Sequence, residues 1–165
     1  MKFRHERGLT LLEAIMVVTL IALGSAIMLP NLSRLLDQAQ AESQRELLTA
    51  HLHQARARAV NEAKMIEVCG SSDGTSCDGR WQLGWLTREY VSGTPSSYYS
   101  SNHSGVTWKG FSSTIIYFAN GTTPSSNGRF DICSPRGSLQ WRLVLNRQGR
   151  LRSEKVTQNT LAAPC

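Results

Sequence analysis

The sequence lacks the residue patterns that usually build an enzyme active site. It contains no Ser, His and Asp in the order of a hydrolytic triad, no paired carboxylates and no glycine-rich phosphate loop. Its four cysteines form no Cys-x-x-Cys, and His51 and His53 stand two residues apart on a predicted helix, where they point away from each other. An enzyme is therefore the least favoured functional class, and we predict no catalytic residue, metal or cofactor.

Charge is almost absent from residues 9–29, where Glu13 is the only charged residue among 21. That length suits one helical crossing of a hydrocarbon layer. The preceding residues 1–8 carry three basic side chains against one acid, which keeps them cytoplasmic and directs the chain beyond residue 29 to the exported side. We predict four segments: a leader (1–8), a transmembrane and filament-core helix (9–29), an amphipathic helix (30–64) and a globular β domain (65–165).

The apolar run also lacks the small-residue cleavage site that ends the hydrophobic region of an ordinary signal peptide. A small residue, Gly8, precedes the run instead, which indicates cleavage between Gly8 and Leu9 and retention of the hydrophobic segment. The new amino group of Leu9 would lie one helical turn from Glu13. Because an unpaired carboxylate is costly in hydrocarbon, we expect Glu13 to pair with the α-amino group of an adjacent copy in a helical assembly.

Two different periodicities come after Pro30. Apolar residues first recur at intervals of three and four, which predicts an amphipathic helix that is kinked at Pro30 and ends near Lys64. From Met65 the period becomes two, in short runs rich in β-branched and aromatic residues that are separated by Gly, Ser, Asn or Asp. The fold class is therefore α+β, with a long N-terminal helix packed on a small antiparallel β domain.

Aromatic residues make up only 7% of the sequence. Three tryptophans lie in strand-like runs and are predicted core anchors: Trp81, Trp85 and Trp141. Tyr98, Tyr99 and Trp108 are candidates for stacking on nucleic-acid bases, although packing within loops is the favoured role for them.

All four cysteines lie beyond the predicted membrane span, on the exported and oxidising side: Cys69, Cys77, Cys133 and Cys165. An even number of cysteines in such a compartment predicts disulfides, and three pairings are possible. Cys69 and Cys77 bracket a short Gly- and Ser-rich loop that closes easily, which favours this pair and leaves Cys133 to join Cys165.

Basic residues are distributed unevenly. The net charge is +6, and residues 9–165 hold 15 basic and 11 acidic residues, a net +4. From Arg129 to Lys155 there are seven basic and two acidic residues, an excess of five that exceeds the total for residues 9–165. One end of the domain is therefore predicted to meet an anionic partner.

The stretch WRLVLNRQGRLR, residues 141–152, predicts a strand, a turn and a second strand. Alternation places Arg150 and Arg152 on the same face, roughly 6.6 Å apart, and Gly149 permits a positive φ at the turn. Two parallel guanidinium groups can bind successive phosphates, and no base-reading element is evident, so we expect DNA-backbone binding without sequence preference. Local charge alone predicts four supporting residues: Arg136, Arg142, Arg147 and Lys155.

The N-terminal stretch RGLTLLEAIMVVTLIALGSAIMLP resembles the class III signal of type IV pilins and pseudopilins. The resemblance implies a prepilin peptidase that cuts after Gly8 and methylates Leu9, and a role for Glu13 in docking onto other pilins. The implied location is a single pass through the inner membrane with the globular domain in the periplasm, and then, after assembly, a pilus outside the cell.

Beyond this signal, the sequence is similar to the FimT and GspH minor pilins, which implies the type IV pilin fold. Three segments carry the similarity: QARARAVNEAKMIEVC, WQLGW and IIYFANGT…GRFDIC…WRLVLNRQGRLR. GRLR matches the Gly-Arg-x-Arg motif of the FimT branch, whose members bind DNA in natural transformation, and assigns the DNA contact to Gly149, Arg150 and Arg152. The alternatives are a structural minor pilin that primes or caps pilus assembly, and a GspH-like pseudopilin of type II secretion.

Overall fold

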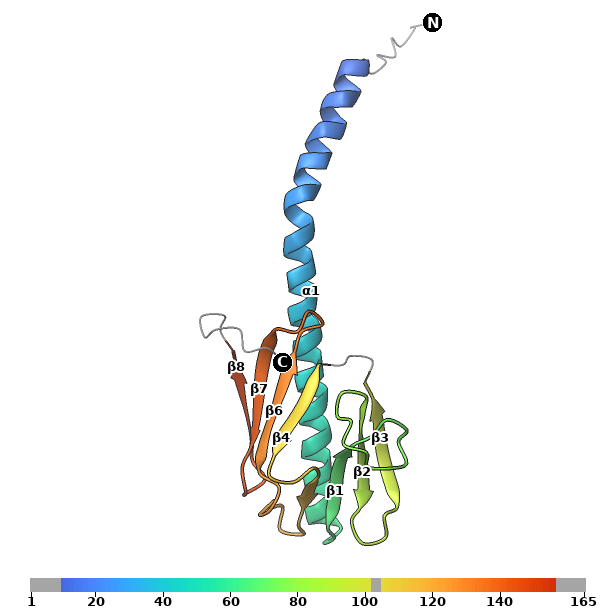
Figure 1. The fold of residues 1–165 in the computed structure, drawn as a ribbon, viewed down its shortest axis with the longest axis vertical. Coiled ribbons are helices and arrows are strands. Elements are labelled where there is room, and N and C mark those ends of the chain that lie inside the picture. Colours follow the sequence, from blue (N-terminus) through green and yellow to red (C-terminus); the bar gives the residue numbers. More distant parts are fainter. Residues whose placement is uncertain (1–9, 102–104, 157–165) are drawn as a thin grey trace, which may run out of the picture. The chain divides into compact units, whose positions relative to one another are not determined.

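The computed structural model describes residues 10–101 and 105–156, with the side chains of residues 26–31 also outside the described part. The chain divides into two compact units, Met1–Leu36 and Asp37–Cys165. The described residues form one helix and eight strands (Figure 1). These are α1 (Leu11–Asn61), β1 (Ile66–Gly70), β2 (Gly84–Glu89), β3 (Pro95–Ser100), β4 (Val106–Gly110), β5 (Ile115–Tyr117), β6 (Gly128–Cys133), β7 (Leu139–Leu145) and β8 (Leu151–Lys155).

In the first unit, α1 begins with a polar cap and continues with exposed apolar side chains. The hydroxyl oxygen of Thr10 accepts a hydrogen bond from the backbone N–H of Glu13 at 3.3 Å, and the Glu13 carboxylate lies in the first turn, where the helix dipole favours an acid. The exposed apolar side chains are Leu11, Leu12, Ile15, Met16, Val17, Val18, Leu20, Ile21 and Leu23. Gly8 and Leu9, the predicted processing site, lie outside the described residues. The predicted kink site, Pro30, falls within the bounds of α1.

Within the part of the chain that the structure describes, no helix combines the length and the apolar character needed to cross a membrane.

In the second unit, one face of α1 enters the core of the domain. The buried residues of this face recur at intervals of three and four: Ala41, Gln44, Leu48, Leu52, Ala55 and Ala59. The helix ends at Asn61, three residues before the predicted end, because the chain turns at Ala63 with a φ of 52°. This apolar stripe is what holds the helix against the strands.

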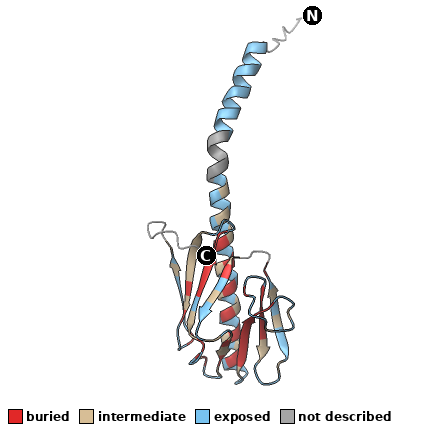
Figure 2. Cartoon of the chain, viewed as in Figure 1, coloured by how far each residue is buried: buried red, intermediate tan, exposed pale blue. Residues whose placement is uncertain are grey.

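The strands form two antiparallel sheets of four. Sheet A has the order β3-β2-β1-β5 and sheet B the order β4-β6-β7-β8. The helix contacts both, since Nε2 of His51 lies 2.8 Å from Oγ1 of Thr87 in sheet A and the guanidinium of Arg45 lies 4.5 Å from the Trp141 ring in sheet B. Buried residues line the strands and the part of α1 beside them (Figure 2). The predicted α+β fold with a helix packed on antiparallel strands is confirmed.

Two of the three predicted tryptophan anchors are fully in the core. Trp81 and Trp85 are buried, and Nε1 of Trp85 donates a hydrogen bond to the carbonyl oxygen of Trp81 at 2.9 Å. Trp141 is only half-buried, at the rim of the core, where the cations of Arg45 and Lys155 lie 4.5 and 5.7 Å from its ring. This tryptophan therefore serves as a platform for basic side chains of its own domain.

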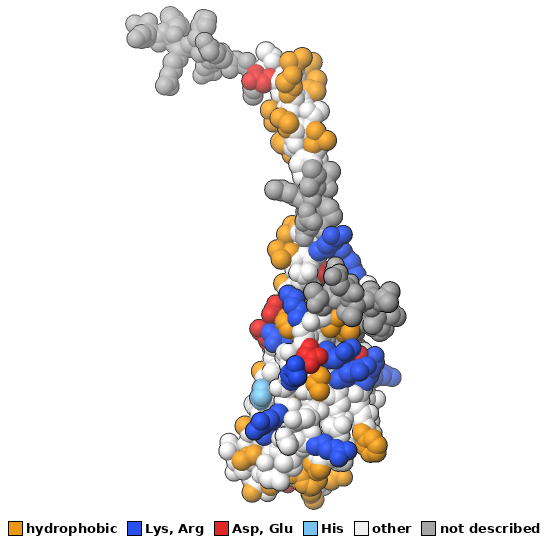
Figure 3. Space-filling model, turned by 90° about the vertical axis from the view of Figure 1, so that its left-hand side faces the viewer, with side chains coloured by type: hydrophobic (Ala, Val, Ile, Leu, Met, Phe, Trp, Pro, Cys, Tyr) orange, Lys and Arg blue, Asp and Glu red, His pale blue; other side chains and the backbone are white. Residues whose placement is uncertain are grey.

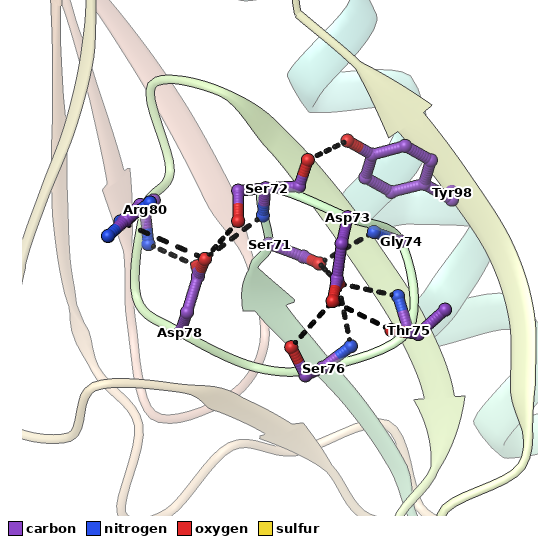
Figure 4. Close-up of polar contacts among 9 residues, drawn as sticks. All are labelled: Ser71, Ser72, Asp73, Gly74, Thr75, Ser76, Asp78, Arg80 and Tyr98. Carbon is purple, nitrogen blue, oxygen red and sulfur yellow. Dashed lines mark hydrogen bonds and ion pairs between the residues drawn. The ribbon is translucent and has the colours of Figure 1, made fainter.

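The segment between β1 and β2 is a loop closed by a Cys69–Cys77 disulfide. Several polar contacts connect residues within this loop (Figure 4). Inside it, Oδ1 of Asp73 accepts hydrogen bonds from the backbone N–H groups of Thr75 and Ser76 at 2.8 and 2.9 Å. These bonds hold the pKa of the Asp73 carboxyl well below its ordinary value. The loop thus keeps its shape through its own contacts.

The second predicted disulfide joins Cys133 to Cys165. Cys133 is buried at the end of β6, whereas Cys165 lies outside the described residues, so this pairing stays a prediction.

Candidate functional site

The predicted hairpin at residues 141–152 is formed by β7, a tight turn and β8. Leu145 pairs with Leu151 across the two strands, and the side-chain oxygen of Asn146 accepts hydrogen bonds from the backbone N–H groups of Gln148 and Arg150 at 3.0 and 2.9 Å. Asn146 thereby closes the turn as an Asx residue does.

The turn is fastened to two other parts of the domain. Arg56 of α1 donates from Nε to the carbonyl oxygen of Gly121 at 2.9 Å and from Nη2 to that of Gln148 at 3.3 Å. Thr123 donates two further hydrogen bonds to carbonyl oxygens of the turn, at 2.8 and 2.9 Å. Gly149 has a φ of 72°, and a Cβ atom there would lie 2.2 Å from the carbonyl oxygen of Gly121. Only glycine fits this position, so the path of the turn is fixed.

Sheet B has an apolar inner face and a basic outer face. Phe130, Leu143 and Leu145 alternate inward into the core, so the residues between them point outward. Each strand contributes one outward cation: Lys109 on β4, Arg129 on β6, Arg142 on β7 and Arg152 on β8. We call these four, together with Arg147 and Arg150 of the adjoining turn, the basic face.

Three of these cations surround one carboxylate. Asp131, whose side chain is only 5% exposed, lies 2.9 Å from Nζ of Lys109, 3.2 Å from Nε of Arg142 and 3.6 Å from Nε of Arg129. Burial by itself raises the pKa of the Asp131 carboxyl, but hydrogen bonds from Lys109 and Arg142 outweigh burial and hold this pKa below its ordinary value. Asp131 therefore stays ionised at neutral pH and neutralises one of three positive charges.

The hairpin cations are more open to solvent. Nε of Arg152 lies 3.4 Å from a carboxylate oxygen of Glu154, yet the Arg152 side chain is 80% exposed, so the pair is weak and easily exchanged. Arg150 is exposed, and its guanidinium group forms no hydrogen bond or ion pair with any residue that the structure describes. The basic face thus holds six cations against the two carboxylates of Asp131 and Glu154.

An open groove of about 720 Å³ crosses the outer face of sheet B beside the turn. Lys109, Arg129, Arg142 and Arg147 line it, and Nε of Arg147 lies 3.4 Å from the side-chain oxygen of Asn127, another lining residue. Figure 3 views the molecule from the side on which Figure 1 draws β8, and lysine and arginine side chains are spread over the β domain on this side. A hollow bordered by guanidinium and ammonium groups is suited to bind phosphate groups.

Two of the predicted supporting residues lie elsewhere. Arg136 is in the turn between β6 and β7 and pairs with Asp37 of α1 at 3.2 Å. Lys155 pairs with Trp141 across β7 and β8 and lies over its ring, on the face opposite Arg152. The basic stretch of the sequence therefore contains residues that lie on opposite faces of sheet B and at opposite ends of its strands.

Two members of the basic face, Arg129 and Lys109, were not predicted as site residues. Arg129 lies within the basic stretch of the sequence, and Lys109 lies outside it. Alternation with the aromatic Trp108 was a signal that Lys109 faces outward, but the pairing of Lys109 with Arg129 across β4 and β6 is not readable from the sequence.

Outside the basic face, His51 is a half-buried titratable group whose pKa is shifted. Burial between α1 and sheet A lowers the pKa of its imidazole from 6.5 to about 4. Its ring lies edge-on to Trp85, with ring centroids 6.0 Å apart, and Oγ1 of Thr87 satisfies Nε2. Among the described residues, no three His, Cys, Asp or Glu side chains are grouped so that they could hold a metal ion.

Comparison with known proteins identifies both sequence and structural relatives. A family model described as type II transport protein GspH matches residues 44–149, so Arg150 and Arg152 lie just beyond the match. Two crystal structures of the type IV minor pilin FimU of Pseudomonas aeruginosa, strain PAO1, determined in different crystal forms, are similar to the structure of this chain. One is 25% identical with a TM-score of 0.55 and covers 76% of this chain and 96% of its own. The other is 26% identical with a TM-score of 0.53 and covers 73% and 97%. No curated protein sequence matches.

Proposed function

Because the chain belongs to the family of type II transport protein GspH, we propose that it is a minor type IV pilin whose globular domain binds DNA through the phosphate backbone. The likeness to the minor pilin FimU, which extends over most of both chains, supports the pilin part of this proposal. The narrower assignment to the FimT branch, and with it a role in natural transformation, rests on the Gly149-Arg150-x-Arg152 motif.

The observation that carries the DNA part is the basic face. Six cations stand against two carboxylates there, and the cations of the hairpin, Arg150 and Arg152, are both exposed to solvent. The turn that presents them is fixed by Arg56, so little ordering is needed when a phosphate binds. Contacts of this kind are non-specific and give dissociation constants on the order of 10⁻⁴ to 10⁻⁶ M. Several copies in one filament would raise the effective affinity.

The N-terminal unit belongs to the same proposal. A prepilin peptidase removes residues 1–8 and leaves Leu9 as the new N-terminus, and residues 9–29 anchor the subunit in the inner membrane before assembly. In the filament, Glu13 pairs with the amino group of a neighbouring pilin. The many exposed apolar side chains between Leu11 and Leu23 support burial against lipid or other pilins. Retraction of the pilus would then draw bound DNA inward.

A structural minor pilin or a GspH-like pseudopilin is the second candidate. The family match favours it, because it covers the core of the domain and ends before Arg150 and Arg152. In that case the partners are proteins and the domain is indifferent to DNA. Deletion of the gene would then abolish pili or secretion, whereas replacing the arginines would change neither.

Replacing both Arg150 and Arg152 by Ala tests the proposal. The full chain in nonionic detergent should bind labelled DNA about tenfold more weakly in fluorescence anisotropy, with unchanged thermal stability. The slope of log K against log salt should lie between about −2 and −4 for the unmodified chain and be less steep by about 2 in the variant. Arg80→Ala plus Arg136→Ala is the matched control, since it removes the same charge elsewhere on the domain. Equal affinity of the hairpin variant and the unmodified chain would refute the site.

A further inference from the structure

One aromatic side chain is exposed where the domain does not need it. Phe111, directly after β4, is 89% exposed, and no other large hydrophobic side chain in the described residues is as open to water. Exposed rings of this size are unfavourable for an isolated domain and often mark a contact with another molecule. Phe111 is therefore the most exposed hydrophobic side chain of the described surface, and it has no role in the function proposed above.

The other aromatic residues considered for base stacking are occupied within the domain. The Trp108 ring lies 4.5 Å from that of Phe130 and donates from Nε1 to the carbonyl oxygen of Ser112 at 2.6 Å. The Tyr99 ring stacks on Trp85 at 4.7 Å. Tyr98 donates from its hydroxyl to a backbone carbonyl of the disulfide-closed loop at 3.3 Å. None of the three offers a free ring face comparable to that of Phe111.

The position of Phe111 is set by the ladder between β4 and β6. Gly110 pairs with Gly128, and the backbone N–H of Phe111 donates to the carbonyl oxygen of Asn127 at 3.3 Å, so the ladder extends one residue beyond β4. Phe111 is two residues after Lys109 and therefore shares its outward face. Lys109 and Asn127 both line the basic groove, so the backbone of Phe111, which is hydrogen-bonded to Asn127, lies at the rim of that groove.

The backbone beneath this rim has little freedom. A Cβ atom on Gly110 would lie 2.1 Å from the Trp108 ring, and one on Gly128 would lie 2.6 Å from the same ring. The indole thus packs directly against both glycines from the core side, and Nε1 of Trp108 ties the adjoining loop back to the strand. The backbone that carries Phe111 is therefore closely packed, although the ring itself is exposed to water.

Exposed aromatic rings beside a row of cations are the combination that binds single-stranded nucleic acid, since the ring stacks on a base while the cations hold the phosphates. In a duplex the base faces are already stacked and not available to Phe111. The next residues along the chain are the polar Ser112 and Ser113, and most of the residues that line the adjoining groove are polar or charged, which suits a nucleic acid better than an apolar protein surface. We propose, on the basis of the DNA-binding function above, that the groove accepts single-stranded DNA and that Phe111 stacks on one of its bases.

The experiment compares a labelled oligo-dT strand with a duplex of equal length, using the full chain in nonionic detergent and fluorescence anisotropy. Phe111→Ala should weaken binding of oligo-dT about five- to fiftyfold and change the affinity for the duplex less than twofold. Phe111→Trp should restore the oligo-dT affinity, and oligo-dT should quench more emission from this variant than from the unmodified chain. Val91→Ala is the matched control, because Val91 is 77% exposed and is not among the lining residues of the groove.

The outcomes separate this inference from the function on which it rests. If Phe111→Ala binds oligo-dT as the unmodified chain does, while Arg150→Ala plus Arg152→Ala weakens all DNA binding, the stacking role is overturned and the DNA function stands. If the unmodified chain binds duplex but not oligo-dT, the inference also fails. If the unmodified chain binds neither form of DNA, the proposed function itself is wrong. Loss of pilin partners by Phe111→Ala with full oligo-dT affinity would make Phe111 a protein contact instead.

Discussion

The Nε atom of Arg56 lies 2.9 Å from the carbonyl oxygen of Gly121, a residue 65 positions later in the chain. The same guanidinium reaches the carbonyl oxygen of Gln148, so a single side chain of α1 joins two loops of the β domain. One of those loops carries Gly149 and leads into Arg150. The helix therefore determines where the cations of the hairpin stand.

Replacing Gly149 by Ala should destabilise the domain by about 2–4 kcal/mol, because the positive φ is unfavourable and the new Cβ atom collides with the Gly121 carbonyl. Gly137→Ala is the control, since Gly137 has a φ of 79° but open space around its Cβ position. It should cost only about 1 kcal/mol. Urea unfolding of both variants measures the difference, and equal losses would show that the collision is relieved at no cost.

Arg56→Ala should lower the free energy of unfolding by about 1–3 kcal/mol, because two carbonyl groups lose their donor. It should also weaken DNA binding, since the turn before Arg150 is no longer held in place. Arg58→Ala removes the same charge from the same helix, and its side chain pairs only with Glu62 among the described residues. A loss of DNA affinity as large in Arg58→Ala as in Arg56→Ala would argue against positioning by Arg56.

Asp131→Asn should tighten DNA binding about three- to tenfold at low salt, since removing the shared carboxylate adds one net positive charge to the basic face. The domain should lose about 1–2 kcal/mol of stability, because Lys109, Arg129 and Arg142 then repel one another. Added salt should restore part of that loss by screening. Anisotropy and urea unfolding at two salt concentrations check both effects. A folded Asp131→Asn protein that binds DNA more weakly would place the contact elsewhere.

Stability should fall between pH 6.5 and about 4 because of His51. In this range the unfolded chain takes up a proton at the imidazole, while burial keeps the folded form neutral, since the pKa of His51 is about 4 in the folded domain. The contribution is fully present above pH 6.5 and is lost as the pH falls, by up to roughly 3 kcal/mol. The lowered pKa values of Asp73, Asp78 and Asp131 act at lower pH, below about 4.

Urea unfolding at several pH values, carried out on His51→Gln and on His53→Gln, tests this assignment. His53 is exposed, so its replacement should leave the dependence on pH unchanged, whereas His51→Gln should flatten it. If both variants keep the full slope, another group is responsible.

The sequence was sufficient for the fold class because two periodicities met at a clear point, between Asn61 and Met65. It was not sufficient for the arrangement of the strands. Apolar alternation shows which residues of a strand face the core, but not which strand lies beside it. The division into two sheets therefore had to come from the structure.

The same limit explains the candidate site. The positive φ at Gly149 was expected from its residue type and is confirmed. Arg136 and Lys155 were grouped with the hairpin only because they are near it in the sequence. No role was predicted for Phe111, because a phenylalanine that follows a strand is usually buried. Its exposure to solvent is known only from the structure.

The order of the strands has a consequence for how the domain comes apart. β4 and β6 pair with each other in sheet B, although β5, which lies between them in the chain, belongs to sheet A. Between β3 and β6 the chain therefore passes from sheet A to sheet B, back to sheet A and again to sheet B, which ties the two sheets together. We therefore expect the interleaved strands to unfold together as one cooperative unit, so that neither sheet comes apart before the other.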